Sequence, residues 1–521
     1  MKSARTHLSV LLLLLALLGA AGVIYATALG PGSSNDSVTY VGAARSLLQG
    51  HGYQALAYDG TLAPMTHYPP LYPTLLALPG LLGVDPLVGA RWLAALCMAA
   101  NILLVGVAVY RFSHGALWAA AIAAVLTLAS AAMTVVHAWA WAEPPFLILA
   151  LLTWMLLDRY SVGKGRAGLW LAGVCMALAC LTRYTGLALV AAAMLWVLWG
   201  GPGTLKRRVA DALLLAALGG APLGLWFARN LLVSSGLANR QIVYHPITRE
   251  QLAEGLATLA GWLWPEQGAQ AWAGWALIAL FVGVAVVGAV RLGRQSRERE
   301  PDAALGRGAA LGSLLPGLFV LVYAATLVVS ISLFDAHTPL DDRILVPVFV
   351  GGLVCIWSTL GALLERAHWG SRAAAALLGL ALVVMAGQRN VAYVQRLHSN
   401  GAGYAATLWT QSALMRAVEA LPPDTALISN VPDGIYILTG RPAAWLPYEV
   451  HAGTRQPNAA FGDEIAAVAA EYAARDGRLV YFHAGTWRWY LPKLDTLKQM
   501  TLLETVVDAR DGEMLRFADG R

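Results

Sequence analysis

The chain has 521 residues, of which 58% are hydrophobic and only 13% are charged. A soluble protein carries about 25% charged residues, so most of the surface of this chain must face something other than water. The formal net charge is +6, but the basic residues stand in short clusters between apolar runs, as they do where positive charge orients membrane helices. The composition therefore argues against a soluble enzyme, and we expect a lipid bilayer, and no nucleic acid, as partner.

Apolar runs of about 20 residues, the length that a helix needs to cross a membrane, recur along the chain. The first run, Leu8–Leu29, is longer than the apolar core of a secretory signal, which predicts an uncleaved first span with a cytoplasmic N-terminus. The runs predict about eleven spans, near residues 8–30, 86–110, 116–136, 139–157, 167–182, 185–200, 210–232, 271–293, 310–333, 343–364 and 371–387.

Positive charge is concentrated in alternate loops between these spans. With the N-terminus inside, the inner loops are residues 111–115, 158–166, 201–209, 294–309 and 365–370, and each contains arginine or lysine. Lysine and arginine are enriched in cytoplasmic loops. The pattern predicts a multi-pass protein of the inner (plasma) membrane, with everything after Gln388 outside the cytoplasm.

Three outer segments precede the tail. The first, residues 31–85, contains an amphipathic stretch, Ser37–Gln49, and a short apolar piece, Leu71–Leu82, with two prolines. Both are too short to span a membrane and predict interfacial or re-entrant helices. A second outer segment contains a polar helical stretch, Thr248–Thr258, and the third is the tight loop Phe334–Arg343.

The tail, residues 388–521, is more highly charged, and its apolar residues alternate. Alternation is typical of half-buried strands. The pattern predicts strands at Ala426–Ser429, Leu479–His483 and Leu502–Val507. It predicts helices at Thr407–Leu421 and Asp463–Arg475. The predicted fold is mostly α: a transmembrane core, residues 1–387, whose outer loop 31–85 is catalytic, followed by an extracytoplasmic α/β domain, residues 388–521.

Polar residues cluster at the outer ends of the predicted spans: Asp36, His67, Tyr68, Glu143, Arg183, Tyr184, Arg229, Asp342 and Arg343. Ionisable groups at the edge of a membrane are costly, so they usually pair, line a cavity or bind a ligand. Three arginines at one depth suit an anionic lipid headgroup, because guanidinium binds phosphate with two parallel hydrogen bonds. A nearby carboxylate can serve as a general base for an attacking hydroxyl.

Each of these residues also has a structural explanation. Arg229 and Arg343 are long enough to anchor at the interface and to pair with Asp341 or Asp342. His67 is explained equally well as an ordinary interfacial residue.

Capping would explain the two carboxylates. Negative charge is favoured at a helix N-terminus, which fits Glu143 in front of two prolines. Asp36 is placed to cap the predicted helix Ser37–Gln49.

The order of these motifs resembles the glycosyltransferase C superfamily, and in particular the bacterial protein O-mannosyltransferase and aminoarabinose-transferase-like membrane glycosyltransferases. The resemblance covers about residues 1–390 and rests on Asn35-Asp36-Ser37 with Tyr40, His67-Tyr68-Pro69-Pro70-Leu71-Tyr72-Pro73, Glu143-Pro144, Leu181-Thr182-Arg183, Arg229-Asn230 and Asp342-Arg343.

This resemblance implies an enzyme that transfers a sugar from a polyprenyl-phosphate donor to an extracytoplasmic acceptor, with inversion. Asp36 would be the catalytic base, and Arg183, Arg229 and Arg343 would bind the donor phosphate. The substrate pocket would include Tyr40, His67, Tyr68, Glu143, Tyr184 and Asp342. Many members carry two adjacent acidic residues in this loop, whereas here Ser37 follows Asp36. The resemblance therefore implies an enzyme that requires no cofactor. A bound divalent cation is compatible with it, but the sequence does not assign the ligands of such a cation.

Two other functions fit the same residues: a transporter or flippase for an anionic lipid-linked substrate, and an inactive relative that only binds glycolipid. A transporter needs a site near the middle of the bilayer, often between repeated halves. The charges here cluster at outer ends and no matching halves are evident, which favours the transferase. The acceptor class stays open between a glycolipid, a glycan and a protein.

Overall fold

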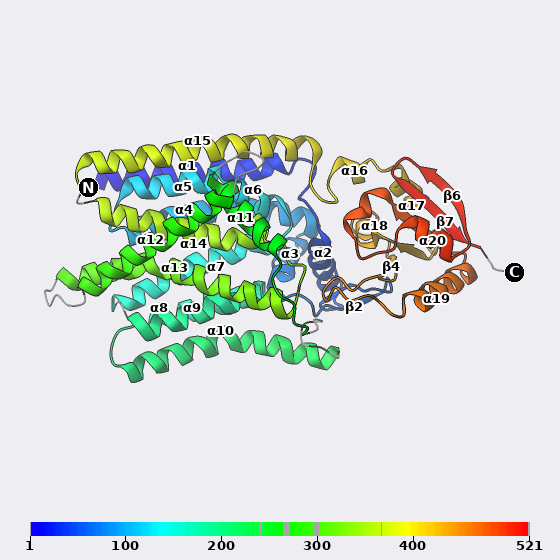
Figure 1. The fold of residues 1–521 in the computed structure, drawn as a ribbon, viewed down its shortest axis with the longest axis horizontal. Coiled ribbons are helices and arrows are strands. Elements are labelled where there is room, and N and C mark those ends of the chain that lie inside the picture. Colours follow the sequence, from blue (N-terminus) through cyan, green and yellow to red (C-terminus); the bar gives the residue numbers. More distant parts are fainter. Residues whose placement is uncertain are drawn as a thin grey trace.

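A computed structural model describes residues 2–163, 165–234, 236, 238, 242–263, 271–295, 302–365 and 367–518. The molecule is elongated, with a bundle of long helices at one end and an α/β region at the other (Figure 1). The N-terminus lies at the far end of the bundle, and the C-terminus lies at the far end of the α/β region.

The predicted spans coincide largely with long helices. The bundle helices are α1 (Lys2–Ala26), α4 (Pro86–Phe112), α5 (Leu117–Ala129), α6 (Ala131–Ala138), α7 (Glu143–Ser161), α8 (Ala167–Thr182), α9 (Gly186–Gly200), α10 (Leu205–Val233), α12 (Ala271–Gln295), α13 (Asp302–Leu333), α14 (Asp342–Leu364) and α15 (Trp369–Asn400). The axis bends by 53° between α5 and α6, where Ser130 ends one helix and caps the next.

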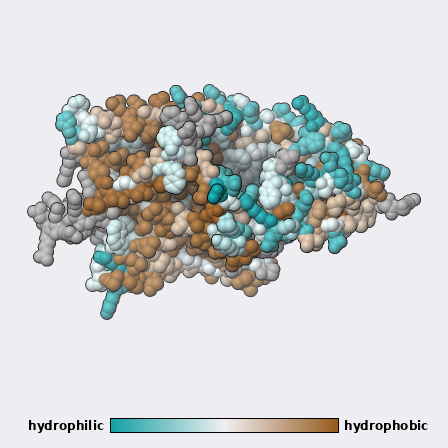
Figure 2. Space-filling view, viewed as in Figure 1, coloured by the Kyte–Doolittle hydropathy of each residue, from teal (hydrophilic) through white to brown (hydrophobic). Residues whose placement is uncertain are grey.

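The chain is a multi-pass membrane protein. Within the described residues, six helices are long and apolar enough to cross a membrane, or seven if the bent α5–α6 pair is one span. Helices α8 and α9 are apolar but shorter, so the number of spans stays a prediction. Hydrophobic residues cover much of the bundle surface and hydrophilic residues gather over the α/β region (Figure 2).

The two interfacial helices predicted in the first outer segment are present as α2 (Asn35–Leu48) and α3 (Leu71–Gly80). Between them lies an unpredicted hairpin of β1 (Gln54–Leu56) and β2 (Leu62–Pro64). The polar stretch of the second outer segment forms α11 (Arg249–Leu263).

The tail is α/β, as predicted. Its elements are α16 (Thr407–Thr410), α17 (Ala413–Glu419), β3 (Leu427–Ser429), α18 (Pro432–Thr439), β4 (Ala444–Trp445), α19 (Phe461–Ala474), β5 (Arg478–Phe482), η1 (His483–Trp487), α20 (Leu494–Met500), β6 (Leu503–Ala509) and β7 (Gly512–Phe517). The sheet order is β4-β3-β5-β7-β6; β3 is parallel to β4 and β5, and β7 is antiparallel to β5 and β6.

A buried ion pair ties the start of the tail to its sheet. Arg488 donates to the Asp433 carboxylate at 2.6 Å and to the Tyr404 hydroxyl at 3.1 Å. The Tyr404 amide in turn donates to the Ser33 carbonyl of the first outer segment at 3.0 Å. The tail is therefore joined directly to the segment that leads into α2.

Candidate active site

Asp36 lies in the first turn of α2 and is not its cap. The cap is Ser34, which forms a capping box with Ser37, so the capping explanation for Asp36 is wrong. Its carboxylate instead accepts a 2.6 Å hydrogen bond from the Tyr68 hydroxyl and forms an ion pair with Arg343. The Asp36 side chain is 22% exposed.

Glu143 lies behind this pair and joins two arginines. It is fully buried and pairs through Oε1 with Nε of Arg343 at 2.7 Å and with Arg183. Its other oxygen, Oε2, has no hydrogen-bond partner among the described residues. The carboxylate therefore orients both guanidinium groups rather than capping α7, whose N-cap is Ala142.

The indole of Trp141 packs against Arg343. The Arg343 guanidinium lies 4.2 Å from the Trp141 ring centroid, and the Trp141 Nε1–H donates to the Ser34 hydroxyl at 2.8 Å. A cation over the face of an indole is held by the ring quadrupole. Trp141 was not among the predicted site residues, although its place two residues before Glu143 was a usable signal.

Asp36, Glu143, Arg183 and Arg343, here called the charge cluster, contain two acids and two bases and are neutral overall. Burial raises the pKa of the Asp36 carboxyl, but the Arg343 charge and the Tyr68 hydrogen bond outweigh it and lower the pKa from 3.8 to about 2. Asp36 is therefore ionised at neutral pH, as a base must be.

Tyrosines line the side of the site next to α2. Tyr40 packs edge-on against Tyr68 at 4.9 Å and against Tyr72 at 5.0 Å between ring centroids. Burial and the nearby Asp36 charge raise the pKa of the Tyr40 hydroxyl, so these phenols stay neutral hydrogen-bond donors. His67 stacks edge-on against Tyr68 at 4.6 Å, which places it beside the cluster.

Asp342 and Asp341 do not pair with Arg343. The Asp342 carboxylate accepts from the Trp262 indole at 2.8 Å, and Asp341 caps α14 through the Ile344 amide at 3.0 Å. The alternative that Arg343 is an interfacial anchor neutralised by these two aspartates is therefore wrong.

Arg229 braces the first outer segment. Its guanidinium donates to the carbonyls of Met65 at 2.7 Å and Tyr53 at 3.3 Å and stacks over Trp226 at 4.7 Å. Tyr184 likewise donates to the Thr66 carbonyl at 3.1 Å. Both contact the segment that carries Tyr68, whereas Arg183 and Arg343 form ion pairs with carboxylates.

We expect Arg229→Ala to loosen residues 53–66, because each charged hydrogen bond to the backbone contributes about 1.5–3 kcal/mol. Hydrogen exchange of these amides should accelerate at least about tenfold. The matched control is Arg208→Ala, which removes an arginine–carbonyl bond at 3.1 Å to Trp199 near the inner end of α10. Unchanged exchange with weakened donor binding would instead assign Arg229 to the phosphate.

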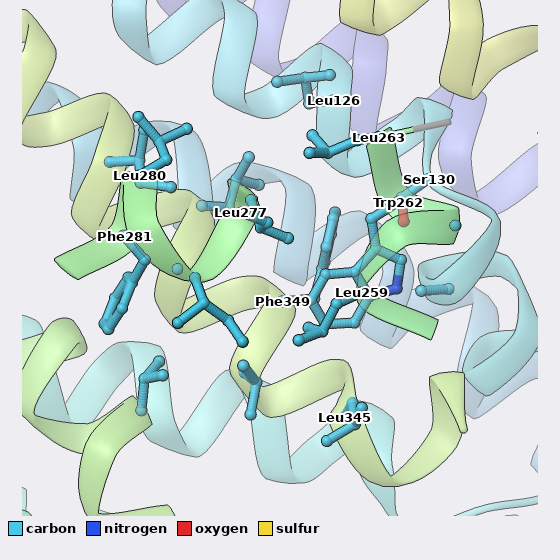
Figure 3. Close-up of a pocket in the computed structure, with 18 of the residues that line it drawn as sticks. Leu126, Ser130, Leu259, Trp262, Leu263, Leu277, Leu280, Phe281, Leu345 and Phe349 are labelled. Atoms are coloured by element: carbon cyan, nitrogen blue, oxygen red, sulfur yellow. The ribbon is translucent and has the colours of Figure 1, made fainter. Parts of the chain in front are cut away.

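An apolar groove of about 750 Å³ runs beside α14. It is lined by residues of α5, α6, α11, α12, α13, α14 and α15, and Arg389 is the charged residue among those that line it. Trp262 and Phe349 project into this space in Figure 3, with ring centroids 5.2 Å apart. Its volume is within the range of about 300–1,000 Å³ that ligand pockets have.

The sequence model of the family described as Dolichyl-phosphate-mannose-protein mannosyltransferase matches residues 54–232. The crystal structure of ArnT from Cupriavidus metallidurans bound to undecaprenyl phosphate is similar, with a TM-score of 0.50 and 14% identity over 98% of this chain and 99% of that one. No curated protein matches the chain at a significant level.

An oligosaccharyltransferase from Archaeoglobus fulgidus, in complex with zinc and sulfate, is also similar, with a TM-score of 0.52 and 14% identity over 90% of this chain and 68% of that one. The chain has the glycosyltransferase C fold. The resemblance and the fold class predicted from the sequence are thus confirmed. The family match supports a glycosyltransferase, and neither comparison supports the transporter alternative.

The residues at the cluster do not fit a metal site. Across the parts of the chain that the structure describes, no three His, Cys, Asp or Glu side chains gather as ligands. Asp36 and Glu143 already pair with arginines, and we derive no step through a metal ion.

Proposed function

We propose that this protein is an inner-membrane glycosyltransferase that moves a sugar from a polyprenyl-phosphate donor to an acceptor outside the cytoplasm. The observation that supports this most is the ion pair between Asp36 and Arg343 beside the buried Glu143–Arg183 pair. It places a partly exposed carboxylate next to two oriented guanidinium groups, which are the base and the anion receptor that the reaction needs.

The two carboxylates take different roles because they differ in exposure. Glu143 is fully buried and Asp36 is 22% exposed, so only Asp36 can meet an acceptor hydroxyl. Two other titratable side chains of the first outer segment suit the role of base less well. Asp59 accepts from Thr61 at a hairpin turn, and His67 packs edge-on against Tyr68. Asp36 takes the proton as the acceptor oxygen bonds to the anomeric carbon.

The phosphate leaves from the opposite face with the electron pair of its bond to that carbon, which inverts the configuration. Arg183 and Arg343 neutralise the charge that grows on the leaving phosphate. Because the cluster is neutral before the donor binds, the phosphate must compete with Asp36 for Arg343. Donor binding therefore releases Asp36 from its ion pair and makes it a stronger base when it is needed.

The apolar groove suits the polyprenyl chain. Leu340 lines the groove and lies three residues from Arg343, so the groove reaches within about 11 Å of that residue along the chain. The N-terminus of α14, where Arg343 stands, also favours a phosphate. A lipid tail in the groove would thus present its headgroup at the charge cluster.

We expect Gly352→Leu to obstruct the groove and to weaken long-chain donors at least about tenfold, since a buried leucine displaces several lipid methylenes at about 0.8 kcal/mol each. A side chain at Gly352 meets no atom within 4 Å, and the residue lines the groove. The matched control is Gly224→Leu on α10, which is equally free of contacts and is not among the residues that line the groove.

The measurement is the transfer rate against donor concentration for a long polyprenyl donor and for a ten-carbon analogue. In Gly352→Leu, binding of the long donor should weaken and binding of the ten-carbon analogue should not. This difference separates obstruction of the groove from misfolding, which would affect both donors. Equal loss with both donors, or loss in neither, would place the lipid elsewhere.

Sidedness follows from the charges. The inner ends of the helices carry basic residues held by buried acids, as where Arg111 pairs with Asp158 at 2.6 Å and Arg166 pairs with Asp211. The N-terminus then lies in the cytoplasm, and the charge cluster and the tail lie outside. We divide the chain into a catalytic core, residues 1–387, and an outer α/β domain, residues 388–521, that serves the acceptor.

A further inference from the structure

Aromatic side chains gather where the tail meets the outer loops of the core. Six of them, here called the aromatic platform, come from four separate segments of the chain: Tyr58, His337, Tyr448, Trp487, Trp489 and Tyr490. None of them has a role in the charge cluster.

The rings of five of these residues form a continuous series. Tyr58 lies 5.0 Å from Tyr448, Tyr448 lies 5.6 Å from Tyr490, and Tyr490 lies 5.9 Å from Trp489. Trp489 lies 5.4 Å from His337 and donates its indole N–H to the His337 ring at 3.2 Å. The series thus runs from the hairpin of the first outer segment, across the tail, to the loop before α14.

Tyr448 and Tyr490 pack against the core of the tail, whereas three other rings of the platform are exposed. Tyr58 is 42%, Trp487 55% and Trp489 43% exposed. The segment that carries both tryptophans is nevertheless held firmly, because Arg488 between them is buried and paired with Asp433. The same guanidinium lies 4.3 Å from the Trp487 ring centroid and supports that ring. Exposed indoles fixed in place are suited to binding, since little side-chain entropy is left to lose.

The platform lies close to the charge cluster. His337 is six residues from Arg343, so the two α-carbons are at most about 22 Å apart. On the other side, Arg488 contacts Tyr404, whose amide bonds to Ser33, three residues before Asp36. A ligand of several linked units on the platform could therefore extend to the base.

We propose that the aromatic platform binds the saccharide part of the acceptor, an inference that rests on the proposed glycosyl transfer. The apolar C–H faces of sugar rings match the flat faces of tryptophan and tyrosine. The Trp489 indole N–H and the Tyr58 hydroxyl already donate within the protein, so ring faces rather than polar edges carry the proposed contact. The six residues include no Asp, Glu, Lys or Arg, which favours a neutral saccharide over a lipid phosphate.

The test measures binding directly, by saturation-transfer difference NMR of mannotetraose and chitotetraose on the full chain in nanodiscs. We expect transfer to the ring C–H protons of at least one tetrasaccharide. The double variant Trp487→Ala/Trp489→Ala should bind it at least about tenfold more weakly. The matched control, Trp369→Ala, removes a 70% exposed indole at the opposite end of the molecule and should leave binding unchanged.

Several outcomes would overturn the inference. Binding of neither sugar would do so, as would equal binding by the double variant. Quenching of Trp487 and Trp489 by brominated lipids would instead make them membrane anchors. The proposed function is judged separately, because Asp36→Asn should lose transfer while keeping the tetrasaccharide bound. If the unmodified protein binds neither tetrasaccharide but catalyses transfer normally, only the platform is overturned.

Discussion

Asp36→Asn should lower the transfer rate about 10²–10⁴-fold, because it removes the general base while keeping size and polarity. Donor affinity should be unchanged or higher, since Arg343 no longer has to leave a carboxylate before it meets the phosphate. The measurement is turnover and donor dissociation constant for the purified variant in one assay.

The control is Asp59→Asn in the same outer segment. Asp59 is an exposed carboxylate that accepts hydrogen bonds from the amide and the hydroxyl of Thr61, and its loss should leave turnover close to the wild-type value. Near-normal turnover in Asp36→Asn would show that Asp36 is not the base. Glu143, the other carboxylate of the charge cluster, could then serve only after a rearrangement that exposes it.

The pH dependence gives a second readout of the same assignment. A pKa lowered to about 2 means that the carboxylate stabilises the donor-free fold above its unfolded value of about 3.9 and loses that contribution as pH falls through about 2. Once the phosphate takes Arg343, the pKa of Asp36 should rise. The acid limb of kcat, which reports the complex, should therefore lie at higher pH than that of kcat/KM, which reports the free enzyme.

Arg343→Lys should lower turnover about 10²–10³-fold, the usual cost of removing one donor that stabilises a developing negative charge. Arg343 reaches Asp36 through one nitrogen and Glu143 through another, and lysine, with a single nitrogen on a flexible stem, cannot hold that fork. Donor affinity should fall as well. Turnover and donor titration in the same preparation measure both effects.

The matched control is Arg91→Lys. Arg91 is also partly buried near the outer side, but it bonds to neutral oxygens, the Thr27 hydroxyl at 3.1 Å and the Ile24 carbonyl at 2.7 Å. Its replacement should leave turnover within a few-fold. If Arg343→Lys behaves like this control, Arg343 only packs against Trp141 and the donor phosphate is held elsewhere.

The candidate site was predictable in part. The order of motifs pointed to Asp36, Tyr40, Tyr68, Arg183 and Arg343, and the structure brings these residues together. The sequence could not separate them from Arg229, which stands at a similar depth but turns to the carbonyls of Met65 and Tyr53. Depth in the membrane follows from position along a helix, whereas the partner depends on how neighbouring helices are rotated and packed.

The sequence by itself determined the membrane class, the positions of the long helices, α2 and α3, and the α/β character of the tail. These features follow from the length of apolar runs, from the spacing of apolar residues and from the charge of the loops, which are local properties of the sequence. Strands as short as β1 and β2 carry too few residues to show a period, so their hairpin was missed.

Only the tertiary structure decided which charges meet. Arg343 and Asp36 are separated by 307 residues, and pairing them requires α14, α7 and the first outer segment to pack in one arrangement. The same packing leaves Asp36 open and buries Glu143. Two carboxylates that look alike in the sequence thereby come to suit the different roles that we propose, a base and a positioning group, because burial and neighbours, and not residue type, set what a charge can do.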